Sequence, residues 1–94
     1  MSETVSVNAR IKGRVQGVWY RAWTVEQATA RGLTGWVRNR SDGSVEAVFS
    51  GTADKVSEML EACKGGPSAA VVTDIETTDA SLPEQGAFRQ VATL

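Results

Sequence analysis

The sequence contains no histidine, and among its 94 residues it holds one cysteine and two prolines. The absence of histidine removes the usual general base at neutral pH and leaves a structural zinc site with almost no ligands. Cys63 has no second cysteine for an internal disulfide, so we expect a reducing, cytoplasmic location. Position 69 is alanine where a cysteine-dependent phosphatase would need arginine, which argues against a phosphocysteine intermediate.

Long apolar runs are also absent. No stretch approaches the roughly 18 apolar residues of a membrane-spanning helix, and the first residues lack the pattern of a signal peptide. The nucleotide-binding patterns GxxxxGK[ST] and GxGxxG are missing as well. We therefore expect a soluble protein with no membrane partner, folded as a single domain over residues 1–94.

Charge is unevenly divided along the chain, although the formal net charge is only −1. Residues 1–40 carry seven Arg or Lys against two Glu, whereas residues 41–94 carry three against nine Asp or Glu. An anionic ligand would therefore be attracted to the first part of the chain. The slightly acidic total argues against a nucleic-acid partner.

Local patterns predict an alternation of strands and helices. Val5, Val7, Ala9 and Ile11 alternate with polar residues, which is typical of a strand with one buried face. Asp42-Gly43 separates two β-like runs and predicts a hairpin. The predicted strands are 5–11, 34–38, 45–50, 70–77 and 88–94, and the predicted helices are 21–31 and 52–63.

This order is βαββαβ plus a C-terminal strand. Both helices must bury their apolar stripes, and right-handed crossovers place them on the same side of the sheet. We therefore predict a ferredoxin-like α/β sandwich of the α+β class, with an antiparallel or mixed sheet and two helices on one face. A loop of polar residues around Pro83 is expected before the last strand.

The segment GRVQGVWYR, residues 13–21, lies between the first predicted strand and the first predicted helix. Glycines let a backbone turn sharply, so that consecutive N–H groups can surround an anion beside the positive end of a helix. Arg21 would add a planar fork of donors that matches two phosphate oxygens. The alternative interpretation is that the glycines only form a tight turn and that Arg21 is a solvated helix residue.

The segments GRVQGVWYR and GLTGWVRNRSDGSVEAVFSG together resemble the two signature segments of the acylphosphatase family, and KGGPSAAV is similar to a later part of that family's chain. The resemblance covers about residues 5–75. It implies a ferredoxin-like fold and hydrolysis of carboxyl phosphates to a carboxylate and inorganic phosphate.

The resemblance also implies roles for individual residues. Arg21 would bind phosphate through its guanidinium, and Asn39 would position the attacking water, which makes these two residues the expected catalytic pair. The phosphate-binding backbone would be that of Val15, Gln16, Gly17, Val18, Trp19 and Tyr20. The side chains of Trp19 and Tyr20 could shield the site from water, contact an acyl group, or simply pack.

An acyl phosphate expels a carboxylate whose conjugate acid has a pKa of about 4, so its departure needs no proton at neutral pH. We therefore expect no general acid, metal or cofactor, with the phosphoryl oxygen of the substrate accepting the proton of the water. The expected partners are a small-molecule acyl phosphate and its product, inorganic phosphate, bound by a monomer.

Two other functions are compatible with the sequence. One is a non-catalytic phosphate-binding or anion-binding regulatory module of the same fold. The other is a sheet that binds RNA, although this sequence lacks the aromatic motif that such sheets usually carry. Asn39 distinguishes the enzyme from a phosphate binder, which has no use for it. The C-terminal strand departs from the family, because Gln90 follows Phe88 where apolar alternation is usual.

Overall fold

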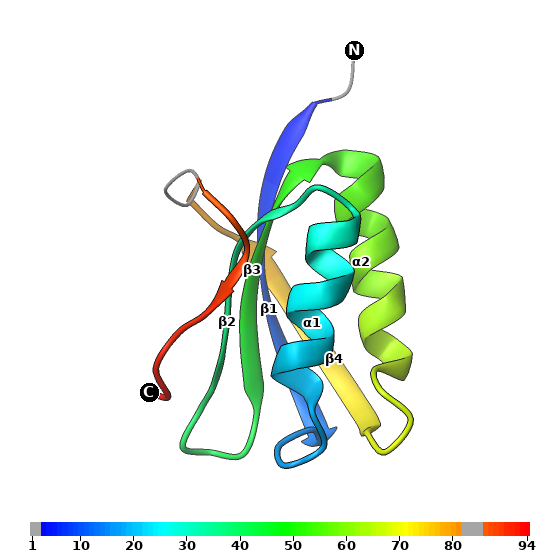
Figure 1. Ribbon diagram of the computed structural model, residues 1–94, viewed down its shortest axis with the longest axis vertical. Helices are drawn as coiled ribbons and strands as arrows, with labels where there is room; N and C mark the ends of the chain where they lie inside the picture. Colours follow the sequence, from blue (N-terminus) through cyan, green and yellow to red (C-terminus); the bar gives the residue numbers. More distant parts are fainter. Residues whose placement is uncertain (1–2, 82–85) are drawn as a thin grey trace.

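The structure is a computed structural model that describes residues 3–81 and 86–94. Its elements, in chain order, are β1 (Thr4–Arg14), α1 (Tyr20–Ala30), β2 (Thr34–Asn39), β3 (Val45–Thr52), α2 (Ala53–Gly65), β4 (Val71–Asp79) and β5 (Arg89–Gln90). The strands form one sheet in the order β4-β1-β3-β2-β5, and both helices cover the same face (Figure 1). This arrangement confirms the predicted ferredoxin-like fold. Neither of the described helices is long and apolar enough to cross a membrane.

The core lies between the sheet and the helices. β1 pairs with β3 in antiparallel fashion, so that Ala9 lies opposite Ala47 and Ile11 opposite Val45, and all four are fully buried. Alternate residues of the same strands face away from the helices, and there Arg10 lies opposite Glu46. The sheet therefore separates an apolar, helix-covered face from a charged one.

Helix α2 follows its predicted pattern. The hydroxyl of Thr52 accepts a hydrogen bond from the backbone N–H of Lys55 at 3.4 Å, which caps the helix N-terminus. Val56, Met59 and Cys63 are buried at helical spacing. Cys63 is thus a core residue, as the sequence predicts.

The first strand is longer than predicted. β1 continues through Arg14 and pairs with β4, with a register shift between Lys12 and Gly13. Gly13 has φ 122, and a Cβ built there would lie 2.2 Å from the carbonyl oxygen of Val71. The assignment of Gly13 to the anion loop was wrong. This glycine allows two strands to approach closely, and the loop is reduced to residues 15–19.

The predicted tail strand at residues 88–94 was wrong in its length, because β5 spans Arg89–Gln90 and runs parallel to β2. Phe88 is buried and stacks on Phe49 with ring centroids 5.5 Å apart. Beyond it, Val91 donates to the carbonyl of Val37 at 2.9 Å. The N–H of Leu94 likewise donates to the carbonyl of Asn39 at 3.2 Å, so the tail continues alongside β2 beyond the two residues that form the ladder. The polar loop predicted around Pro83 falls on residues 82–85, outside the described residues.

Candidate active site

The loop of residues 15–19 carries two residues in the left-handed region, Gly17 with φ 75 and Trp19 with φ 68. Where left-handed residues alternate with right-handed ones, successive N–H groups point toward a common centre. This arrangement forms an anion-binding nest. Within the described residues, the N–H groups of residues 16–21 donate no hydrogen bond to another protein group. The loop thus presents several unused donors.

Trp19 is the N-cap of α1, and its side chain makes no capping hydrogen bond. A non-glycine residue with positive φ costs about 1–3 kcal/mol and is found preferentially at functional sites. The first turn of α1 contains no acidic residue. The positive end of the helix dipole and its free N–H groups are therefore available to an anion.

Two buried side chains hold the ends of this loop. Val15 is 1% exposed, and Tyr20, also 1% exposed, donates a hydrogen bond from its hydroxyl to the backbone carbonyl of Cys63 at 2.6 Å. Burial raises the pKa of Tyr20 well above its ordinary value. Burial likewise raises the pKa of the Cys63 thiol to about 12, so neither group ionises near neutral pH. Their contribution is structural.

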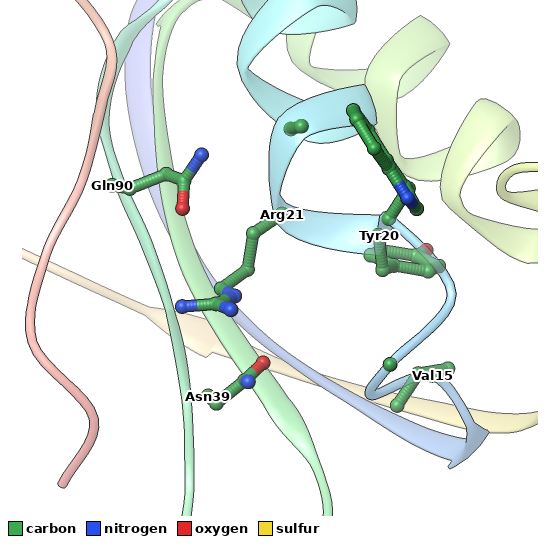
Figure 2. A pocket seen from close by; sticks show the side chains of 8 residues that line it. Val15, Tyr20, Arg21, Asn39 and Gln90 are labelled. Atoms are coloured by element: carbon green, nitrogen blue, oxygen red, sulfur yellow. The ribbon is translucent and has the colours of Figure 1, made fainter.

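Arg21 projects from the first turn of α1 into a cavity of about 290 Å³ beside the loop. Figure 2 shows its guanidinium between the carboxamides of Asn39 and Gln90. Among the described residues, Arg21 forms no salt bridge. The cavity is lined by Val15, Gly17, Trp19, Tyr20, Arg21, Ala22, Asn39 and Gln90.

Asn39 is the last residue of β2, and alternation places its side chain on the helix-covered face together with Val37. Its carboxamide is directed toward Arg21 (Figure 2). The Oδ1 atom is buried and has no hydrogen-bond partner within the described residues. An unpaired buried acceptor costs about 1–3 kcal/mol. A bound water or ligand in the cavity would satisfy it.

The arginines on either side of Asn39 belong to the opposite face of the sheet. Arg38 and Arg40 both bind Oε1 of Glu46, at 2.9 and 3.1 Å. Arg10 approaches the other oxygen of Glu46 at 3.8 Å. These contacts turn Arg38 and Arg40 away from the cavity, where Arg21 supplies the positive charge.

The structure brings most of the predicted site residues together. Val15, Gly17, Trp19, Tyr20, Arg21 and Asn39 line one cavity. Val18 packs against the core, and the side chain of Gln16 reaches the turn between β2 and β3. That their backbone amides bind phosphate stays a prediction. Trp19 is 81% exposed, and Tyr20 packs in the core.

Sequence reasoning missed two residues of the cavity, Ala22 and Gln90. Gln90 is the register partner of Val37 in the parallel β2–β5 pair, and the side chain of Val37 lies on the helix-covered face. Gln90 shares that face and so reaches the cavity. The available signal was a polar residue two positions after Phe88 in the predicted tail strand. Among residues 3–81 and 86–94, no cluster of acidic and cysteine side chains could hold a metal ion.

Comparisons with known proteins agree on one family. The acylphosphatase family model matches residues 7–90. The chain is 55% identical over 85 residues to the acylphosphatase of Rhodospirillum rubrum, covering 90% of this chain and 93% of that protein. It is 51% identical over 92 residues to the acylphosphatase of Azorhizobium caulinodans, covering 97% of this chain and 99% of that protein. The crystal structure of the acylphosphatase from Bacillus subtilis matches with a TM-score of 0.88 at 38% identity, covering 93% of this chain and 98% of that one.

Proposed function

The chain belongs to the acylphosphatase family and hydrolyses acyl phosphates, and we propose that the amides of residues 15–20 and Arg21 bind the phosphoryl group while Asn39 orients the attacking water. The observation that carries this assignment is the buried, unpartnered Oδ1 of Asn39, in the same cavity as Arg21. A site that only bound phosphate would need the loop and the guanidinium. It would not need an unsatisfied carboxamide beside them.

The proposed roles match the charges that develop in the reaction. The phosphoryl group bears its negative charge on three equatorial oxygens, which require several fixed donors. The loop amides, the helix N-terminus and the guanidinium supply such donors without reorganisation. Arg21 is free of carboxylates within the described residues, so its donors stay available to the substrate.

The bond changes need no general acid. The oxygen of water forms a bond to phosphorus, the bond between phosphorus and the carboxyl oxygen breaks, and the carboxylate leaves with the electron pair. Its conjugate acid has a pKa of about 4, so it leaves unprotonated at neutral pH. Asn39 accepts a hydrogen bond from the water and aims it, and a phosphoryl oxygen takes the proton. This scheme requires no metal, and we expect full activity after dialysis against EDTA.

The experiment is an ultraviolet assay of benzoyl phosphate hydrolysis, with inorganic phosphate as competitor. Arg21→Ala should lower kcat/KM and weaken phosphate inhibition together. Each loss should correspond to about 3–4 kcal/mol, because a critical donor is missing. Asn39→Ala should lose about 100-fold in kcat with a nearly unchanged inhibition constant for phosphate. Arg14→Ala is the matched control, since Arg14 is exposed at the end of β1 and does not line the cavity.

The competing function is a non-catalytic phosphate-binding module. Phosphate binding without turnover of any acyl phosphate by the unmodified protein would favour that module over the enzyme. Near-normal turnover by Asn39→Ala would remove Asn39 from the mechanism. We also propose that the protein acts as a monomer in the cytoplasm, a reducing compartment that suits the free, buried Cys63 thiol.

A further inference from the structure

The side chain of Gln16 joins the phosphate loop to the hairpin that follows Asn39. Its Nε2 donates one hydrogen bond to the carbonyl of Arg40 at 2.7 Å and another to the carbonyl of Ser44 at 2.9 Å. Both hydrogens of the amide are thereby used. We propose that Gln16 is a positioning residue that fixes Asn39, and the water it holds, relative to the bound phosphoryl group. This inference rests on the proposed roles of the loop and Asn39.

The two carbonyls that Gln16 binds close the turn between β2 and β3. The N–H of Arg40 donates to the carbonyl of Ser44 at 2.9 Å, and the N–H of Gly43 donates to the carbonyl of Arg40 at 3.1 Å. Each carbonyl therefore accepts one bond from the turn and one from Gln16. Because Arg40 directly follows Asn39, the amide of Gln16 holds the chain one residue from the catalytic carboxamide.

The topology explains why such a link is needed. Arg21 and the loop belong to the β1–α1 connection, whereas Asn39 lies on β2, and β3 separates β1 from β2 in the sheet. No strand pairing joins the loop directly to Asn39. Among the described residues, the side-chain hydrogen bonds between loop 15–19 and the β2–β3 turn are the two made by Gln16. A displacement of about 1 Å between reacting groups can cost about 100-fold in rate.

A positioning role predicts a specific kinetic signature. The phosphate donors all lie on one continuous segment, so losing the link to the hairpin leaves the inhibition constant of inorganic phosphate within about threefold. The water, in contrast, loses its alignment, and kcat falls by about tenfold. A merely structural role would lower the unfolding midpoint and would leave the kcat of the folded enzyme unchanged.

The test is a double-mutant cycle with Gln16→Met and Asn39→Ala, assayed on benzoyl phosphate with inorganic phosphate as competitor. Methionine has nearly the length of glutamine and no N–H donor. Gln27→Met is the matched control, because Gln27 lies on α1 and its Oε1 accepts a hydrogen bond from Arg31 outside the cavity. Thermal unfolding of each variant gives the folded fraction. If Gln16→Met does not fold, Gln16→Asn, which is one methylene too short to reach both carbonyls, carries the same test.

We expect Gln16→Met to lose about tenfold in kcat in the wild-type background and less than twofold in the Asn39→Ala background. Independent losses in both backgrounds, or an equal loss in phosphate affinity, would overturn the positioning role. An unchanged kcat in a folded Gln16→Met protein would overturn it as well, even where Asn39→Ala is strongly impaired. If Asn39→Ala itself turns over normally, the proposed role of Asn39 is wrong and this inference falls with it, while the acylphosphatase activity stands.

Discussion

The hydroxyl of Tyr20, the first residue of α1, donates a 2.6 Å hydrogen bond to the carbonyl of Cys63 in the last turn of α2. The contact continues through the ring of Tyr20, since a Cβ at Gly66 would lie 2.6 Å from its Cε2 atom. The two helices are thus joined where the phosphate loop enters α1. The side chain of Tyr20 therefore anchors the N-terminus of α1 to the core.

Tyr20→Phe should lower the free energy of unfolding by about 1–3 kcal/mol, because the buried carbonyl of Cys63 loses its side-chain donor. Urea unfolding measures the change. The ring remains in place, so phosphate inhibition of the folded enzyme should stay within about threefold of wild type. An unchanged unfolding midpoint would show that the hydroxyl contributes nothing to the anchoring of α1.

The glycines of the signature segment should respond differently to alanine. Gly13→Ala introduces a Cβ 2.2 Å from the Val71 carbonyl and should cost at least about 3 kcal/mol of stability, with phosphate affinity retained in the folded fraction. Gly17→Ala meets no atom within 4 Å and should cost about 1 kcal/mol for its φ of 75. Because it reshapes the nest, it should weaken phosphate inhibition several-fold. Urea unfolding and competitive inhibition of both variants test this contrast, and the reverse pattern would contradict it.

Glu46 should make the free energy of unfolding depend on pH. Burial opposes its ionisation, but hydrogen bonds from Asn8 and Arg38 and the charges of Arg38 and Arg40 lower its pKa below the ordinary 4.5. A carboxyl group whose pKa is lower in the folded state than in the unfolded state stabilises the fold at pH values above the unfolded-state pKa. This stabilisation is lost as the pH falls through the folded-state pKa. Glu46→Gln should therefore be less stable than wild type by about 2 kcal/mol at pH 7, with a smaller difference at pH 3.

Urea unfolding at the two pH values measures this difference. Glu26→Gln is the control, because Glu26 is exposed on α1 and forms no salt bridge among the described residues. A Glu46→Gln deficit that is the same at pH 7 and pH 3 would show that the carboxylate charge is not what stabilises the arginine cluster.

Gln90 should influence which acyl groups are accepted. It is exposed at the edge of the cavity. If the loop and Arg21 bind the phosphoryl group as proposed, we expect the acyl group to extend past Gln90 toward solvent. Gln90→Leu adds apolar surface and should raise kcat/KM for benzoyl phosphate relative to acetyl phosphate by about fivefold, corresponding to about 1 kcal/mol. Phosphate inhibition should not change. Thr93→Leu, outside the cavity lining, is the control, and an unchanged substrate ratio in Gln90→Leu would contradict the prediction.

The features that the sequence predicted well are those with local causes. The Asp42-Gly43 turn forms because Oδ1 of Asp42 accepts the N–H of Ser44 at 2.9 Å and Gly43 adopts φ 94. Helix α2 likewise follows from Thr52 and its buried residues at helical spacing. The pairing of Arg21 with Asn39 came from a family resemblance, and the fold places both residues in one cavity.

The features that were missed depend on contacts distant in the sequence. Gly13 belongs to β1 because β4 approaches it, about 60 residues later in the chain. Gln90 reaches the cavity because β5 lies parallel to β2, a pairing that no local pattern of residues specifies. The left-handed Trp19 is a third case, since no local rule favours tryptophan at positive φ.

The most direct measurement of the central claim is a crystal structure of the protein with a non-hydrolysable acyl phosphonate bound. We predict that the phosphonate oxygens accept hydrogen bonds from the loop amides and the Arg21 guanidinium, with a water held by Asn39 opposite the bond to the acyl group. A phosphonate bound elsewhere, or an Asn39 carboxamide that contacts no water beside the phosphorus atom, would contradict the account.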